Sequence, residues 1–386
     1  MKTMKTMKAV HVGAGNIGRG FIGLLLHEAG YELVFADVAD ALITRLQEAD
    51  SYQVRTVGQH PTTTVVDGFT AINSSQDPDV LAAQIAEADV VTTAVGAHIL
   101  RFVAPDIAAG IAARPATSPR LAVMACENAI NATDLLEQEI RANYSGDDLE
   151  DKALFSNTAV DRIVPVQAED AGLDVTVEDF SEWAVERGPF DGQEPDVPGI
   201  TWVDDLGPYI ERKLFTVNTG HATTAWHGWR AGHARIAEAI ADPSVAQQVE
   251  AVLGETSALL VAKHGFTADD MAAYRTKVLA RFANEALPDP VERVGRAPLR
   301  KLSRHDRIIG PAAELAERGL GCEGLLACFA AALAFTPDGD EEADRLQEIL
   351  RGQDADAATE EITGLDASHP LFAAARERVA ARQRTL

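Results

Sequence analysis

A lysine, an asparagine and a histidine that lie close together in the chain could perform acid–base chemistry on an alcohol. Lys213, Asn218 and His221 follow the spacing Lys-x4-Asn-x2-His. At about 100° per residue in an α-helix, their side chains would lie within an arc of roughly 140°. A lysine whose pKa is lowered can take the hydroxyl proton. Asn218 could donate an N–H group to the developing alkoxide, and His221 could orient a neighbouring hydroxyl. A solvated Lys213 beside incidental polar residues is the alternative.

A glycine-rich turn near the N-terminus predicts a dinucleotide site. It follows a short apolar stretch, precedes a helical pattern, and consists of Gly13, Ala14, Gly15, Asn16, Ile17 and Gly18. Gly13 allows a tight turn, Gly15 lets the backbone approach a pyrophosphate, and Gly18 lets the following helix lie close to the sheet. The helix N-terminus offers free N–H groups to the phosphates. A plain glycine-rich turn is the alternative.

An acidic residue about 20 positions further on favours NAD over NADP as the dinucleotide. Asp37 ends the next apolar stretch, and Val38, Ala39 and Asp40 after it include no arginine. The Asp37 carboxylate can accept hydrogen bonds from a ribose 2′-hydroxyl and would repel a 2′-phosphate.

Two further polar positions follow strand-like segments. Asn128 comes shortly after the segment 121–124, and Asp161 directly follows the segment 155–160. Ligands bind at the carboxyl ends of parallel strands, so Asn128 could be a second donor to an oxyanion. The alternatives are an ordinary turn asparagine and, for Asp161 with Arg162, an ion pair.

A basic segment interrupts the acidic second half of the chain. Residues 293–307 hold six basic residues and one acidic residue, and include Arg293 and Lys301. Such a reversal of charge suits a phosphate or a carboxylate, because arginine offers forked donors. A surface helix whose bases pair with surrounding acids is the alternative.

The elements that must position these groups fall into two domains. Strand-like segments (8–12, 33–36, 90–94, 121–124) alternate with helical ones (17–28, 41–48, 80–87, 100–113) in the first part. This alternation predicts an α/β Rossmann-type doubly wound sheet. Residues 52–57 and 62–66 resemble an added hairpin, and 155–160 and 173–177 are expected to extend the sheet. Helical patterns dominate afterwards (236–263, 268–286, 312–317, 325–335, 341–351). We therefore expect an NAD-binding domain over 1–200 and an all-α substrate domain over 201–386.

Composition excludes several function classes. The 386 residues carry a formal net charge of −25, which disfavours nucleic-acid and anionic-membrane partners. The three cysteines are too few and too scattered for a disulfide framework or a zinc site. No apolar stretch is long enough for a transmembrane helix, and residues 1–8 lack the apolar segment of a secretion signal. These features predict a soluble cytoplasmic protein.

The chain resembles the polyol-specific long-chain dehydrogenases over nearly its whole length. The resemblance rests on segments 13–20, 35–38, 92–96, 125–128, 159–165, 212–221 and 296–302, several of which are specific to that family. One departure is that Ile210 stands where some relatives have a glutamate, with Glu211 one place away.

The resemblance implies a reaction and a role for each candidate residue. Lys213 would be the general acid/base, Asn128 and Asn218 would hold the reacting oxygen, and His221 and Asp161 would contact the polyol. Arg293 and Lys301 would line the distal pocket, where a phosphate would lie. The implied reaction is the metal-independent interconversion of D-mannitol 1-phosphate and D-fructose 6-phosphate with NAD. The sequence leaves the oligomeric state open, and we favour a monomer.

Three other functions compete with this one. A dehydrogenase of unphosphorylated mannitol or of a hexuronate would use the same base, and a carboxylate would suit the basic segment equally well. A non-catalytic NAD-binding sensor would have no need of a base.

Overall fold

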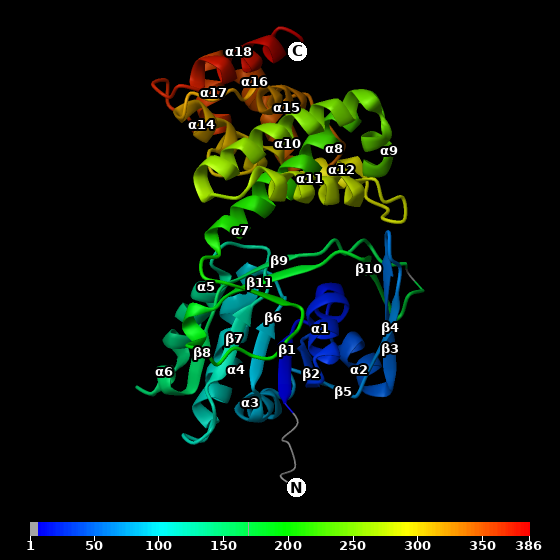
Figure 1. Cartoon of the computed structure of the whole chain (residues 1–386), viewed down its shortest axis with the longest axis vertical. Coiled ribbons are helices and arrows are strands. Elements are labelled where there is room, and N and C mark those ends of the chain that lie inside the picture. The colour runs from blue at the N-terminus through cyan, green and yellow to red at the C-terminus, as the bar shows by residue number, and fades with distance from the viewer. Residues whose placement is uncertain (1–6, 169) are drawn as a thin grey trace. The chain divides into compact units, whose positions relative to one another are not determined.

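The chain folds into two compact units. The computed structural model describes residues 7–168 and 170–386, and the units span Met1–Tyr209 and Ile210–Leu386 (Figure 1). Of residues 1–8, for which we expect no secretion signal, only Met7 and Lys8 belong to the described residues. Strand β12 (Ile200–Val203) crosses the domain boundary expected at 200 and pairs with β11 (Glu182–Glu186) of the first unit.

A six-stranded parallel sheet forms the centre of the first unit. Its order is β5-β2-β1-β6-β7-β8, which is the doubly wound order with the crossover between β1 and β6. The strands are β1 (Lys8–Val12), β2 (Glu32–Asp37), β5 (Phe69–Asn73), β6 (Val90–Thr93), β7 (Leu121–Ala125) and β8 (Ala153–Phe155). The short apolar segments become strands because both faces of the sheet are covered.

Alternate side chains of each strand enter two separate cores. On β2, Leu33 and Phe35 join one buried cluster, whereas Val34 and Ala36 join the other. The helices of this unit are α1 (Gly23–Glu28), α2 (Asp40–Glu48), α3 (Pro78–Glu87), α4 (Leu100–Ala113), α5 (Ala132–Asn143) and α6 (Leu149–Lys152), with 3-10 turns η2 (Ala97–Ile99) and η3 (Gly188–Phe190). The predicted doubly wound fold is confirmed.

Two small sheets flank the main one, and here the sequence interpretation was partly wrong. The expected hairpin is present as antiparallel β3 (Ser51–Val57) and β4 (Thr63–Asp67). Strand β10 (Val175–Glu178) pairs with β3, and β9 (Thr158–Asp161) pairs with β11. Only β8, which shares just Phe155 with the expected segment 155–160, extends the main sheet. The chain leaves that sheet at Ser156 and Asn157, so the following strand finds a different partner.

The second unit is helical throughout the residues described. It contains α8 (Thr219–Ala231), α9 (Ile236–Ala241), α10 (Pro243–His264), α11 (Ala268–Phe282), α12 (Val291–Gly295), α13 (Pro298–Lys301), α14 (Ile309–Glu317), α15 (Glu323–Ala332), α16 (Glu341–Gly352), α17 (Ala355–Thr363) and α18 (Phe372–Gln383). Helix α7 (Gly207–Arg212) links the units in sequence. Among the described residues, none of the helices is long and apolar enough to span a membrane.

One expected helix is two helices. The sequence predicted a single helix over 236–263, but the chain breaks at Asp242, where α9 ends and α10 begins. Pro243 is the first residue of α10, and the Asp242 side chain accepts a hydrogen bond from the Ser244 N–H group. A proline has no N–H group for the preceding helix and favours the first helical position, so the break follows from Asp-Pro-Ser.

Candidate active site

Two of the three glycines of the N-terminal turn have a steric reason to be glycine. Gly13 has φ +105°, and a Cβ there would approach the Ala94 carbonyl oxygen to 2.5 Å. A Cβ on Gly18 would collide with the Gly13 carbonyl oxygen. In contrast, a Cβ on Gly15 would meet no atom within 4 Å. Gly13 and Gly18 are therefore required by the fold, whereas the space beside Gly15 fits a pyrophosphate.

Asp37 is fixed against the same turn. Its Oδ2 accepts a hydrogen bond from the Ala14 N–H group at 2.8 Å, and its Oδ1 accepts one from the Ala39 N–H group at 2.9 Å. A carboxylate offers about four acceptor sites, so two remain for other donors. The glycine turn and a held carboxylate at the end of β2 fit the phosphates and the ribose hydroxyls of NAD.

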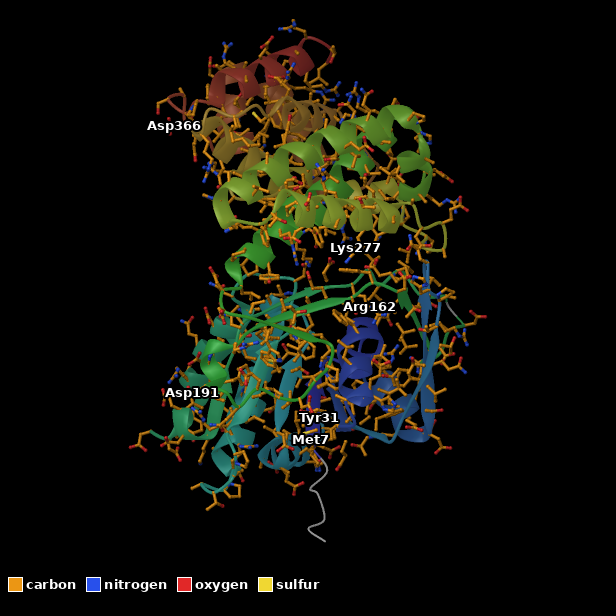
Figure 2. All side chains as sticks on the ribbon, in the orientation of Figure 1. Met7, Tyr31, Arg162, Asp191, Lys277 and Asp366 are labelled. Atoms are coloured by element: carbon orange, nitrogen blue, oxygen red, sulfur yellow. The ribbon has the colours of Figure 1, made fainter. Side chains whose placement is uncertain are left out.

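Two arginines that the sequence interpretation did not assign brace this turn. Arg19 is buried and lies in η1 (Gly18–Ile22), a π-helical turn; it donates to the Ala14 carbonyl oxygen and, at 3.2 Å, to Asn16 Oδ1. Arg162, which is labelled in Figure 2, donates to the Gly20 carbonyl oxygen at 3.3 Å. Its guanidinium lies over the Phe21 ring. Arg162 therefore supports the helical turn that follows the glycine turn. Sequence periodicity does not reveal which arginines are buried.

Glu127 organises the loop after β6. It is 5% exposed and accepts hydrogen bonds from Thr93 Oγ1 at 2.8 Å, the Val95 N–H group at 2.9 Å and the Gly96 N–H group at 2.8 Å. These bonds hold the loop that contacts Gly13. Asn128 is the next residue, so Glu127 also fixes the backbone from which the candidate Asn128 projects.

Asp161 ends β9 in the first unit. It is 6% exposed and stands opposite Glu182 in the antiparallel pair of β9 and β11. Asp161 is thus the last residue of an antiparallel strand in a small sheet, not of a parallel strand as expected, and Asn128 lies three residues after the end of β7. Both belong to the first unit, whereas the other candidate side chains belong to the second.

The second unit begins with a π-helical turn at the candidate base. This turn, η4 (Lys213–Asn218), continues directly into α8, which carries His221. The Thr219 N–H group bonds to the Leu214 carbonyl oxygen five residues back. The sequence analysis assumed a regular α-helix, and that geometry was wrong here. In a π turn the hydrogen bonds join residues five apart, so Lys213 and Asn218 lie nearer to one face than they would in an α-helix, and such turns recur at functional sites.

A threonine hydroxyl accompanies this π turn. Thr219 Oγ1 lies 2.9 Å from the Leu214 carbonyl oxygen and 2.6 Å from the Arg307 carbonyl oxygen. The hydroxyl therefore ties the turn to the basic segment 293–307. A side chain that bonds to backbone carbonyls can support a departure from regular α-helix.

His221 is held by a carboxylate that the sequence interpretation missed. Its Nε2 lies 2.8 Å from Asp289 Oδ2, and its ring stacks on Phe282 at a centroid distance of 4.9 Å. Burial alone would raise the pKa of Asp289, but His221 and Arg293 outweigh it and lower that pKa. The His221 imidazole is thus fixed on one edge and one face.

The same carboxylate holds Arg293. Asp289 Oδ1 accepts hydrogen bonds from Arg293 Nε at 3.0 Å and from its Nη2. Asp289 is 5% exposed, so this ion pair lies in a sheltered environment. Asp289 therefore links the proposed polyol contact His221 to the proposed phosphate contact Arg293. In the sequence, only the spacing Asp-x3-Arg could have indicated the pairing of Asp289 with Arg293.

Lys301 is a buried lysine among arginines. It is 5% exposed, and its Nζ donates to the Val294 carbonyl oxygen at 2.5 Å. Burial lowers the pKa of Lys301 to about 7, and the charges of Arg307, Arg300 and Arg296 contribute to the shift. A bound anion would stabilise the charged form of Lys301 and raise its pKa.

Glu211 has partners other than the candidate base. Its Oε1 lies 2.8 Å from Lys263 Nζ, and its Oε2 lies 2.6 Å from His264 Nε2. Burial would raise the pKa of Glu211, but these two partners lower it. Glu211 therefore belongs to an ion-pair network between α7 and α10, and Ile210 leaves the glutamate position of some relatives without a carboxylate.

The structure brings the candidates into two groups. In the first unit, the glycine turn is joined to Asp37 by a hydrogen bond and contacts the loop held by Glu127. In the second, η4 and α8 carry Lys213, Asn218 and His221, and Asp289 joins His221 to Arg293. Across the described part of the chain, no three His, Cys, Asp or Glu side chains are grouped to hold a metal ion.

Two family models match the chain in succession. The mannitol dehydrogenase Rossmann domain matches residues 7–199, and the mannitol dehydrogenase C-terminal domain matches residues 205–373.

Curated relatives match over almost their entire length. A mannitol-1-phosphate 5-dehydrogenase of Paenarthrobacter aurescens (strain TC1) is 61% identical and covers 98% of this chain and 99% of the relative. The protein of the same name from Aspergillus niger is 51% identical, over 96% of this chain and 97% of the relative.

Solved structures share the fold at low identity. The mannitol 2-dehydrogenase of Pseudomonas fluorescens, solved with NAD and D-mannitol, aligns with a TM-score of 0.75 at 18% identity, over 98% of this chain and 94% of the other. A D-sorbitol dehydrogenase in substrate-free form aligns with a TM-score of 0.80, also at 18% identity, over 97% of this chain and 95% of the other.

Proposed function

Because the chain belongs to the mannitol dehydrogenase family, we propose that it interconverts D-mannitol 1-phosphate and D-fructose 6-phosphate with NAD, and that Lys213 is the general acid/base. The activity is supported by relatives of that name at 61% and 51% identity over nearly the full chain. The observation that supports the mechanism is the π turn η4, which runs from Lys213 to Asn218 and continues into the helix that carries His221.

The chemistry of the bound cofactor is the acceptance or return of a hydride at the substrate carbon. During oxidation Lys213 takes the proton of the reacting hydroxyl, and during reduction it returns that proton. Asn218 and Asn128 donate N–H groups to the oxygen and stabilise its developing charge. His221, held by Asp289 and Phe282, and Asp161 contact the hydroxyls along the polyol.

Phosphate recognition belongs to Arg293 and Lys301 in this proposal. The Arg293 guanidinium is oriented by Asp289, and Lys301 lies among three further arginines. Free mannitol offers no negative charge to this segment. A hexuronate would offer a carboxylate, which is smaller and carries less charge than a phosphate dianion.

One assay tests cofactor, substrate and reaction together. The absorbance of NADH is followed with purified protein and fructose 6-phosphate, fructose or fructuronate, and then with NADPH in place of NADH. We expect rapid loss of NADH with fructose 6-phosphate alone. Turnover of fructose or fructuronate instead would overturn the assignment of Arg293 and Lys301. NADH binding without turnover of any ketose would support a sensor.

Two substitutions test Lys213 itself. Lys213→Ala should leave the dissociation constant of NADH unchanged and lower kcat by about 10² to 10⁴, the usual contribution of a positioned acid or base. Lys213→Arg keeps the positive charge but does not release its proton, so it should be comparably inactive. Near-normal kcat in either variant would exclude Lys213 as the base.

We also propose a cytoplasmic monomer. The three cysteines Cys126, Cys322 and Cys328 are free and buried, as suits a reducing compartment. Analytical ultracentrifugation should give a single species near the chain mass of 41.2 kDa. A concentration-independent larger species would refute the monomer.

A further inference from the structure

The second unit contains a groove on a side of α8 other than that of His221. It has a volume of about 600 Å³ and is formed by residues of α8, α10, α15 and α18. The polar side chains that line it are His227, Arg230, Ser244, Gln248, Glu323 and Arg378. His227 follows His221 by six residues on the same α-helix, a spacing that turns its side chain away from the His221 face. The volume lies within the range of small-molecule sites, about 300–1,000 Å³.

Cations and neutral donors dominate this groove in a strongly acidic protein. Arg230 and Arg378 supply two guanidinium groups, and Ser244 and Gln248 supply a hydroxyl and an amide. The one acidic side chain of the lining, Glu323, is 80% exposed and pairs with Arg378 Nη2 at 3.0 Å. A local excess of positive charge in a chain of net charge −25 selects for anions.

Polar atoms in the groove have no partner among the described residues. Nε2 of His227 and Nε of Arg378 are both buried without a hydrogen bond. Burial, reinforced by the charge of Arg230, lowers the pKa of His227 to about 4, so the imidazole is neutral at pH 7. An unsatisfied buried polar atom costs about 1–3 kcal/mol, a cost that an accepting ligand would remove.

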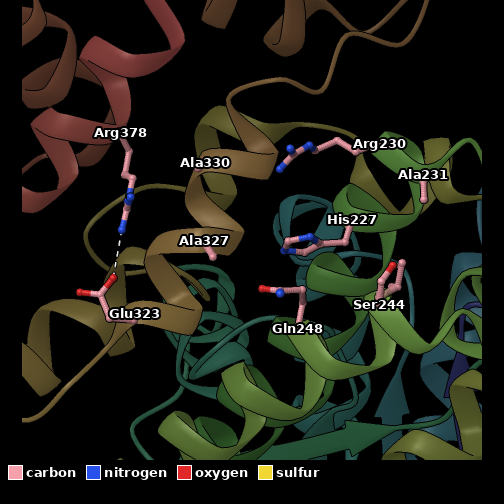
Figure 3. A pocket seen from close by; sticks show the side chains of 10 residues that line it. His227, Arg230, Ala231, Ser244, Gln248, Glu323, Ala327, Ala330 and Arg378 are labelled. Carbon is pink, nitrogen blue, oxygen red and sulfur yellow. Dashed lines mark hydrogen bonds and ion pairs between the residues drawn. The ribbon is translucent and has the colours of Figure 1, made fainter.

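The side chains also share a direction. Figure 3 shows Arg230 and His227 projecting from α8, and Gln248 from α10, toward the helix that carries Ala327 and Ala330, while Arg378 and Glu323 form a separate group. The alanines leave the space open in front of the three polar groups. A single oxyanion could therefore reach a guanidinium, an imidazole and an amide together.

We propose that this groove binds the phosphate group of a small metabolite, at a site separate from the catalytic residues. The Arg230 guanidinium and the Gln248 amide donate to the phosphate oxygens, and the His227 ring completes the contact through Nε2. Arg378, which lies apart with Glu323, adds positive charge at longer range without contacting the phosphate. Arginine is suited to this task because its fork matches two oxygens of a phosphate.

The test is a titration of the whole protein, labelled with ¹⁵N-histidine, with inorganic phosphate and then with pyrophosphate. The His227 signals, assigned by their absence in His227→Asn, should shift saturably at millimolar phosphate. Its titration midpoint should rise, because a neighbouring anion stabilises the imidazolium form. Arg230→Gln should weaken phosphate binding at least tenfold, and Arg230→Lys should weaken it less.

A matched control lies on the same helix as Arg378. Arg376 is exposed and pairs with Asp356 at 2.6 Å, so Arg376→Gln should leave the titration unchanged, whereas Arg378→Gln should weaken it. Circular dichroism confirms that each variant is folded. An unshifted His227, an equal response in Arg230→Gln, or a response that never saturates and thus reports an adventitious ion only, would overturn the proposal. None of these readouts depends on turnover.

Discussion

Raising the pH from 7 to 9 should selectively remove the preference of this enzyme for a phosphorylated substrate. Burial and the charges of Arg307, Arg300 and Arg296 lower the pKa of Lys301 to about 7. A lysine with a lowered pKa is charged below that value and neutral above it. About half of the Lys301 side chains are therefore charged at pH 7, and about one in a hundred at pH 9. The phosphate of the substrate, with a second pKa of about 6, is already a dianion throughout this range.

The size of the effect follows from these fractions. If the charged Lys301 is required to bind the phosphate, kcat/KM should fall about fifty-fold between pH 7 and pH 9, equivalent to about 2 kcal/mol. The parameter kcat/KM reports the free enzyme, so a rise of the Lys301 pKa in the complex does not hide the change.

The assay must cancel the pH dependence of the proton-transfer step itself, which is common to both substrates. The quantity to follow is therefore the ratio of kcat/KM for fructose 6-phosphate to that for fructose, measured with NADH at each pH. Lys213 and the cofactor affect numerator and denominator alike. The ratio should fall about fifty-fold in the wild type.

Substitutions of Lys301 define the outcome further. Lys301→Met keeps most of the apolar volume and removes the charge, so its ratio should be low and independent of pH. Lys301→Arg keeps the charge at pH 9, so its ratio should be flat and high. A wild-type ratio that stays constant from pH 7 to pH 9, or an unchanged ratio in Lys301→Met, would refute the assignment of Lys301 to the phosphate.

Three further substitutions test other parts of the site. Asp289→Asn removes the charge that holds His221, and should lower kcat/KM about 10- to 100-fold with NADH affinity unchanged in a fluorescence titration; unaltered kcat/KM would show that the contact is only structural. Gly15→Ala should keep Tm and weaken NADH binding, since its Cβ meets no protein atom, whereas Gly18→Ala should lower stability by about 1–3 kcal/mol in thermal unfolding; the reverse pattern would contradict the steric assignment. Asp37→Ser should raise the ratio of NADPH to NADH activity about tenfold or more in steady-state assays, because it removes a negative charge near a 2′-phosphate; an unchanged ratio would count against the role of Asp37.

The parts of the fold that local sequence determines were predictable. Buried parallel strands are short apolar runs, so β1 was predicted with its observed bounds, Lys8–Val12. The glycine turn was recognised because backbone conformation and close approach leave room for no other residue at Gly13 and Gly18. The second strand ends at Asp37, as the position of that acid suggested.

Pairings between distant segments were not predictable in the same way. The sequence predicted strands at 155–160 and 173–177, but not which strand each one joins. Both leave the main sheet for small sheets of their own. The break between α9 and α10, in contrast, was available from Pro243 and was overlooked because apolar periodicity continues across it.

The candidate site shows the same division between local and distant information. The spacing of Lys213, Asn218 and His221 identified the helix, but not the π turn that sets their directions, since a helical period of 3.6 was assumed. Asp289 was missed because its importance comes from His221, which is remote in sequence. No local pattern marks a carboxylate that is needed by a distant imidazole.

The position of Asp289 also suggests how the site would select substrates of one length. One oxygen of this carboxylate faces His221, and the other faces Arg293. In our proposal His221 contacts the polyol and Arg293 contacts the phosphate, so a single buried side chain fixes the separation of the two contacts. A substrate whose phosphate lay one carbon nearer could satisfy only one of them. The enzyme should therefore discriminate among ketose phosphates of different length. This discrimination should weaken in Asp289→Asn, because His221 and Arg293 would no longer be held at a fixed separation.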